Sequence, residues 1–436
     1  MLRKKLNHSE SPRNVSSDHP GTSGSEPGLD LGEELEILHP LGCGWSNEGS
    51  IEPIEEEWEV DRVPTRVPKD GFCPNSRNFV EDDEKRSDLE YELIQKEINL
   101  EKLQRITSTG IPDGGTLRAT TWKLLLGYLP PSRDSWQKVL SENRVKYSKL
   151  KEEYLLSPLQ VSSREETSSS GEHGDGPLRR HDVSDEDHPL SLGETSAWQK
   201  YFEFTEIAEQ IDRDLQRTHP DLKFFTSPSQ KKKEPMRNIL LLFAKLNPTT
   251  LYVQGMNEIL APIYYVFCTD PVEENAANAE ADSFGCFVRL LSDSVDHFCQ
   301  QLDNNSSVGI HSTLSRLQEM LKVNDEELWQ HLEVTTKVNP QFYAFRWITL
   351  LLTQEFQFNT ILRIWDSLLS HPSGVQDMLL RICCAMLIHV KNILLKGDFA
   401  TNLYLLQHYP KVDIEQLLQE ARDIIPDTST HRVSVD

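Results

Sequence analysis

Helical periodicity is the feature that most constrains how this chain can fold. Leu89, Leu93 and Leu100 follow one another at intervals of four and seven residues, which place side chains on one face of a helix. Comparable spacing continues toward residue 425, whereas the alternation typical of strands is nearly absent and β-branched residues do not cluster. No segment repeats at a period of about 20–50 residues, so a solenoid is not expected. The sequence therefore predicts an all-α domain.

Helices are predicted from the same spacing along most of the chain. Prolines and polar turns separate them, and a last pair lies before Pro426. The first leucine-rich segment spans 89–103, and the further predicted ranges are 117–129, 136–156, 198–218, 238–246, 257–267, 276–302, 310–321, 326–332, 342–356, 360–369 and 376–395.

Two acidic segments lack this pattern. Residues 1–85 contain 19 acidic and 9 basic residues, and residues 156–197 contain 9 acidic and 3 basic residues with nine serines. Such segments bury too little apolar surface to offset the entropy lost on ordering. We therefore predict a largely disordered N-terminal region (1–85), a folded domain (86–425) with a disordered insertion (156–197), and a C-terminal tail (426–436).

Composition and motifs exclude several classes of function. The net charge of −24 disfavours contact with a nucleic-acid backbone, and seven cysteines without a CxxC pair predict no zinc site or disulfide framework. The longest apolar runs are shorter than the ~18 residues of a membrane span, and the N-terminus has no signal-peptide core. GxxxxGK[ST], GxGxxG, GxSxG and HExxH motifs are absent, so no cofactor or metal site of the chain's own is predicted. A soluble, cytoplasmic protein is expected; a peripheral location on endomembranes stays open.

The first of three informative stretches is residues 110–130. Glycine-containing turns precede a helix that places Arg118 and Trp122 four residues apart on one face. A guanidinium over an indole makes a cation–π contact. We interpret this pair as structural.

The second stretch, residues 207–221, combines a buried helix face with a charged pair at the helix end. Ile211 belongs to the buried face. Asp214 and Arg217 are three residues apart, so the carboxylate can orient the guanidinium. Because Pro220 ends the helix, Arg217 projects from its last turn. A cation in the last turn also complements the helix dipole, so Arg217 could be there for helix stability alone.

The third stretch, residues 246–267, places polar groups at a helix entrance. Tyr252 and Gln254 are two residues apart and precede Gly255, which permits close approach of another backbone. Asn257 follows and shapes the turn. The Gln254 amide can both donate and accept a hydrogen bond, which a group that orients a water molecule must do. The alternative is that Gln254 only caps a polar turn.

Together the three stretches read RxxxW, IxxDxxR and YxQ, and in this order they resemble the signature of the TBC family of Rab GTPase-activating proteins. Residues 339–356 and 362–369 are similar to the C-terminal helices of that family. The resemblance covers about residues 105–425, and residues 280–287 resemble most the branch that contains TBC domain family member 13.

The resemblance implies a two-lobed helical domain that binds a GTP-loaded Rab and supplies two side chains to its active site. Arg217 would be the arginine finger, and Gln254 would be the glutamine finger that positions the attacking water. The resemblance assigns supporting roles to Asp214, Tyr252, Gly255 and Asn257, and structural roles to Arg118, Trp122 and Ile211.

Several expectations about partners follow from the same resemblance. The protein would be a catalytic activator rather than an enzyme by itself, and GTP and Mg²⁺ would be carried by the Rab. Membrane contact would be indirect, through the lipidated GTPase, and the reaction would switch off a vesicle-trafficking step. The alternative is a non-catalytic scaffold of the same fold that binds a small GTPase or an effector; the intact Arg217 and Gln254 argue against it.

Overall fold

The computed structural model describes residues 75–155, 197–226, 233–292 and 309–426. The chain divides into two units, Met1–Gly71 and Phe72–Asp436, and every described residue belongs to the second. In the described ranges the chain forms helices and turns, with an isolated bridge between Glu97 and Ser132 and no strand. The all-α prediction is confirmed.

The predicted disordered segments lie largely outside the described residues. Helix α1 (Asn75–Leu93) begins ten residues before the predicted boundary at residue 85, and α6 (Ala197–Arg217) begins at the last residue of the predicted insertion. The predicted C-terminal tail is described only at its first residue, Pro426.

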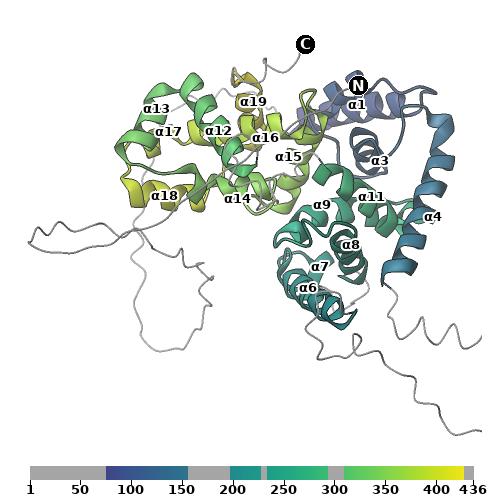
Figure 1. Ribbon diagram of the computed structural model, residues 1–436. Coiled ribbons are helices and arrows are strands. Elements are labelled where there is room, and N and C mark those ends of the chain that lie inside the picture. The colour runs from purple at the N-terminus through teal and green to yellow at the C-terminus, as the bar shows by residue number, and fades with distance from the viewer. Residues whose placement is uncertain (1–74, 156–196, 227–232, 293–308, 427–436) are drawn as a thin grey trace, which may run out of the picture. The chain divides into compact units, whose positions relative to one another are not determined.

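One group of helices packs around α9 (Met256–Cys268) and α11 (Ala279–Ser292). Helix α11 contacts α4 (Trp136–Leu155), α8 (Lys233–Leu246) and α9, and α8 also contacts α6 (Figure 1). Helix α9 is buried along almost its whole length because its sequence is nearly all apolar. The other elements of this part of the chain are α2 (Leu100–Thr107), α3 (Leu117–Leu125), η1 (Arg133–Ser135), α7 (Lys223–Thr226) and α10 (Glu273–Ala277).

A second group packs around α16 (Val375–His389). This helix contacts α12 (Ile310–Asn324), α14 (Ala344–Thr349), α15 (Phe358–Ser370) and α19 (Ile414–Asp423), as can be followed in Figure 1. Helix α15 joins the two groups because it also contacts α2, α3 and α9. The remaining elements are α13 (Glu326–Gln330), η7 (His331–Thr335), η8 (Pro340–Phe342), α17 (Lys391–Leu394) and α18 (Phe399–Gln407).

The prediction of one helix over residues 342–356 is wrong. Helix α14 ends at Thr349, and the chain turns through Leu351 and Leu352, whose φ angles are +50° and +63°. Leucine disfavours this conformation, but both side chains are buried and the Leu351 carbonyl accepts a hydrogen bond from the Trp365 indole at 3.2 Å. Burial therefore outweighs helix propensity, and the turn leads into the segment that borders the candidate site.

Other predicted helices are interrupted or shifted. Segment 89–103 is divided into α1 and α2, since the Asn99 side chain caps α2 by accepting from the Lys102 backbone N–H. Segment 276–302 breaks at Asn278, between α10 and α11, and segment 376–395 breaks at Val390. Helix α8 begins before the predicted residue 238 and accommodates Pro235 in its first turn, where a backbone N–H is not required.

Candidate functional site

An exposed arginine at the end of α6 is held by a buried carboxylate. Asp214 is only 3% exposed, whereas the Arg217 side chain is 54% exposed. Nη2 of Arg217 donates to Oδ1 of Asp214 at 2.6 Å. Ile211, Asp214 and Leu215 share the buried face of α6, and Arg217 follows them in the exposed part of the last turn. The guanidinium is thus fixed at one nitrogen and free to contact another molecule through the rest of its fork.

The same carboxylate joins α6 to the segment before α9. The Tyr252 hydroxyl donates to Oδ2 of Asp214 at 2.6 Å and lies 3.1 Å from Oδ1 of Asn257. Burial raises the pKa of Tyr252 far above its usual value, so the phenol stays protonated and keeps its donor role. The tyrosine and the arginine therefore share one buried anchor.

Asn257 and Gly255 fix the entrance of α9. Oδ1 of Asn257 accepts from the Gly255 N–H at 3.1 Å, and its Nδ2 donates to Oγ1 of Thr218 at 2.8 Å. Gly255 has a φ of +105°, and a Cβ built there would lie 2.4 Å from Cδ2 of Leu350. Both the backbone conformation and the close approach of Leu350 require glycine at this position.

Gly255→Ala should destabilise the fold by about 1–3 kcal/mol, since an L-residue is strained at this φ, and it should also displace the adjacent Gln254 through the clash with Leu350. Denaturant unfolding measures the first effect. The activity that the sequence resemblance leads us to expect, stimulation of GTP hydrolysis by a Rab, is the measure of the second. Gly127→Ala is the matched control, because Gly127 has a φ of +66° and open space around its Cα. Equal effects of the two substitutions on hydrolysis would contradict the role given to the Leu350 contact.

Gln254 is exposed between the buried Tyr252 and Gly255. Tyr252, two residues before it, and Gly255, directly after it, are both held by hydrogen bonds, so Gln254 lies on a turn that is anchored on both sides. The structure thus brings all six residues of the predicted site together at the junction of α6 and α9.

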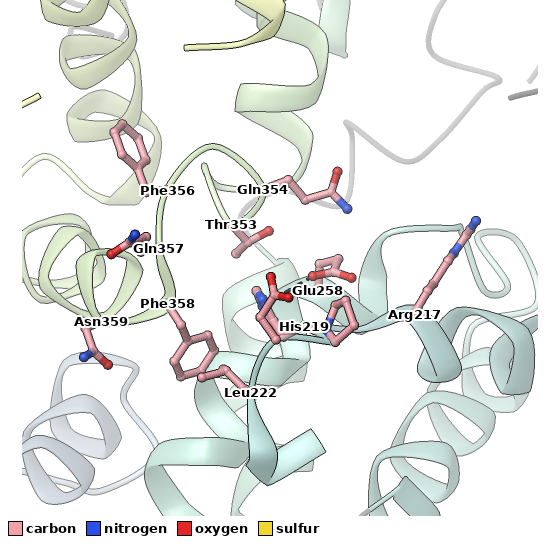
Figure 2. Close-up of a pocket in the computed structure, with 12 residues that line it drawn as sticks. Arg217, His219, Leu222, Glu258, Thr353, Gln354, Phe356, Gln357, Phe358 and Asn359 are labelled. Atoms are coloured by element: carbon pink, nitrogen blue, oxygen red, sulfur yellow. Dashed lines mark ion pairs between the residues drawn. The ribbon is translucent and has the colours of Figure 1, made fainter. Parts of the chain in front are cut away.

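A cleft of about 600 Å³ borders this junction (Figure 2). It lies between the end of α6, the start of α9 and the connection from α14 to α15. Of the predicted site residues only Arg217 lines it, and Figure 2 shows this side chain extending away from Glu258 and His219. The other lining residues are Pro220, Asp221, Leu222, Thr353, Gln354, Phe356, Gln357, Phe358 and Asn359.

Glu258 and His219 are residues of the cleft that motif reasoning missed. Burial raises the pKa of Glu258 to about 7, against the opposing effect of Arg217 and with a further increase from Asp214. Burial also lowers the pKa of His219 to about 4, so this imidazole is neutral at pH 7. Nε2 of His219 lies 3.4 Å from Oε2 of Glu258. A sequence signal for Glu258 did exist, since it is a carboxylate within the apolar run of α9.

Glu258→Gln should stabilise the protein above pH 7. In the wild type, the pKa of Glu258 is 4.5 in the unfolded chain and about 7 in the folded protein. The free energy of unfolding is therefore unaffected by this group below pH 4.5 and falls progressively as the pH rises to about 7. The difference in unfolding free energy between variant and wild type should therefore be near zero at pH 4.5 and reach roughly 3 kcal/mol at pH 8. Urea unfolding at several pH values measures it, and a difference independent of pH would contradict the assignment.

Arg118 and Trp122 lie elsewhere and meet through a third residue. Nε1 of Trp122 donates to Oδ1 of Asp366 at 2.8 Å, and Nη2 of Arg118 pairs with Oδ2 at 3.1 Å. The Ile111 N–H donates to the same carboxylate. The two side chains therefore meet at the buried carboxylate of Asp366 and not in the predicted cation–π contact. These bonds connect α3 to α15.

The described residues contain no group of three or more His, Cys, Asp or Glu side chains placed to hold a metal ion. None of the helices in the described ranges combines the length and apolar character that a membrane span requires.

Comparison with known proteins identifies the family to which the fold belongs. Residues 186–395, which include Arg217, Gln254 and Glu258, match the model of the Rab-GTPase-TBC domain family. The chain is 36% identical over 401 residues to TBC1 domain family member 13 of Homo sapiens and of Mus musculus, covering 78% of this chain and 97% of each relative. This chain belongs to the TBC family of Rab GTPase-activating proteins.

Further relatives agree with this family. A TBC domain-containing protein of Schizosaccharomyces pombe is 30% identical over 445 residues, covering 74% of this chain and 70% of the relative. The crystal structure of the Ypt/Rab-GAP domain of Gyp1p superposes with a TM-score of 0.60 and 26% identity, over 78% of this chain and 98% of that domain. TBC family membership supports activation of Rab GTPases as the general function and a Rab GTPase as the partner.

Proposed function

We propose that the protein binds a GTP-loaded Rab and accelerates hydrolysis by inserting Arg217 and Gln254 into the Rab active site. The observation that carries this proposal is an exposed guanidinium fixed by a buried carboxylate, Asp214, that also holds Tyr252 two residues before Gln254. A side chain offered to a partner must be exposed, and it acts fastest when it is already oriented.

The chemistry of each finger suits its residue type. The γ-phosphate oxygens gain negative charge in the transition state, and Arg217 supplies a permanent planar cation to neutralise it. The Gln254 amide can accept a hydrogen bond from the attacking water and donate one at the same time. Because both residues come from one hydrogen-bonded junction, they would approach the nucleotide together.

GTP and Mg²⁺ come from the Rab in this mechanism, so the chain requires no cofactor of its own. It works from the cytoplasm and contacts membrane only through the lipidated Rab. Returning that Rab to its GDP-bound state ends a vesicle-trafficking step.

The test is phosphate release from a panel of GTP-loaded Rabs with the wild type, Arg217→Ala and Gln254→Ala. The proposal expects stimulation of one or a few Rabs by the wild type and its loss in both variants. GTP-dependent binding without stimulation of any Rab would make the protein a scaffold and overturn the mechanism.

A further inference from the structure

The cleft beside Arg217 contains a buried carboxylate without a cation. Glu258 is 5% exposed, and Oε1 accepts a hydrogen bond from the Asn257 amide at 3.1 Å. Within the described ranges, no lysine or arginine lies within 4.0 Å of it; the basic side chain at that range is His219. A buried carboxylate normally has a cationic partner, because burial strongly disfavours the isolated charge.

Neither nearby basic group neutralises Glu258. Arg217 is held by Asp214, and Figure 2 shows its side chain directed away from Glu258. His219 is neutral at pH 7, and the edge contacts of its ring with Phe358, at a centroid distance of 4.9 Å, fix its orientation. Its buried Nε2 has no hydrogen-bond partner among the residues that the structure describes.

The rest of the described cleft lining combines apolar and polar side chains and, apart from Arg217 and His219, contains no basic residue. The exposed Asp221 follows His219, and the connection from α14 to α15 contributes the side chains of Gln354, Gln357 and Asn359. The amide oxygens can accept hydrogen bonds from an ammonium or guanidinium group. A cleft of about 600 Å³ is also large enough for one long side chain.

We propose that this cleft receives a lysine or arginine side chain of the partner Rab, whose charge pairs with Glu258. The inference rests on the proposed function, because Arg217 lines the same cleft and a Rab engaged by Arg217 would cover its mouth. Glu258 would then contribute to affinity and to the choice among Rabs, whereas Arg217 contributes to the rate.

Pairing with a cation requires the ionised form of Glu258. The charged groups that face it are Asp214 and Arg217 from α6 and Asp221 from the following turn, and the lining residues from the α14–α15 connection are uncharged. Since burial places the pKa of Glu258 at about 7 in the free protein, binding of the cation should release a proton. Affinity for the Rab should therefore rise by about tenfold between pH 6 and pH 8.

The test measures affinity rather than hydrolysis. A responsive Rab loaded with a non-hydrolysable GTP analogue is titrated with wild type, Glu258→Gln and Glu209→Gln at pH 6, 7 and 8. Glu258→Gln should weaken binding at pH 8 by about tenfold or more and remove the pH dependence. Glu209→Gln, which removes an exposed acid of α6 that does not line the cleft, should retain both. Alanine substitution of each surface Lys and Arg of that Rab should then give one position that no longer responds to Glu258→Gln.

The outcomes separate this inference from the proposed function. Unchanged affinity in Glu258→Gln, or equal losses in Glu258→Gln and Glu209→Gln, would overturn the pairing whether or not hydrolysis is stimulated. Binding that depends on Glu258 and on pH, without stimulation of hydrolysis, would overturn only the two-finger mechanism. The absence of binding to any Rab would overturn both.

Discussion

Arg217→Ala is expected to reduce Rab-stimulated GTP hydrolysis by about 10³–10⁵-fold while retaining most of the affinity for the GTP-loaded Rab. The guanidinium acts on charge that appears in the transition state, so its loss lowers the rate more than it lowers binding. Its 54% exposure also means that few internal contacts are lost on truncation. Single-turnover phosphate release and equilibrium binding measure the two quantities.

Two further variants sharpen this prediction. Arg217→Lys keeps the positive charge but lacks the planar guanidinium, which can bind Asp214 through one nitrogen and phosphate oxygens through another. Most of the stimulation should therefore still be lost. Arg213→Ala is the matched control, since Arg213 is an exposed arginine one helical turn earlier and does not line the cleft. An Arg217→Ala protein that stimulates hydrolysis at the wild-type rate would exclude the arginine-finger mechanism.

The helices were predictable because their apolar spacing is a local property of the sequence. Predictions failed where a distant contact decides the backbone. The positive φ angles of Leu351 and Leu352 depend on burial and on Trp365, fourteen residues after Leu351. Pattern reasoning therefore extended a helix through the turn that forms one wall of the cleft.

The candidate site was predictable in its residues but only partly in its contacts. Spacing within α6 gave the pair Asp214–Arg217, which the structure shows at 2.6 Å. The hydrogen bond from Tyr252 to Asp214 spans 38 residues and has no local signal. Glu258 did have a local signal, as a carboxylate within the apolar run of α9, whereas His219 had none. The shifts in the pKa values of both residues arise from burial that only the packed structure defines.

Trp122→Ala is expected to lower the free energy of unfolding by about 3–5 kcal/mol. The indole is fully buried, and its ring centroid lies 5.7 Å from that of Trp365. Truncation would leave a large cavity and would remove a donor from the buried carboxylate of Asp366. Because Arg118 and the Ile111 N–H would still satisfy Asp366, packing should account for most of the loss.

Trp122→Phe helps to separate the two contributions, since it keeps an aromatic ring and removes the hydrogen bond to Asp366 with only part of the buried volume. It should cost about 1–3 kcal/mol, clearly less than Trp122→Ala, in chemical denaturation followed by circular dichroism. In both variants the folded fraction should stimulate hydrolysis normally, because Trp122 does not line the cleft and its hydrogen bond and ring contact are made with Asp366 and Trp365 of α15. If Trp122→Ala kept its full stability but lost stimulation, this residue would instead lie at the Rab interface. The same would follow if both variants lost activity equally while their unfolding midpoints stayed unchanged.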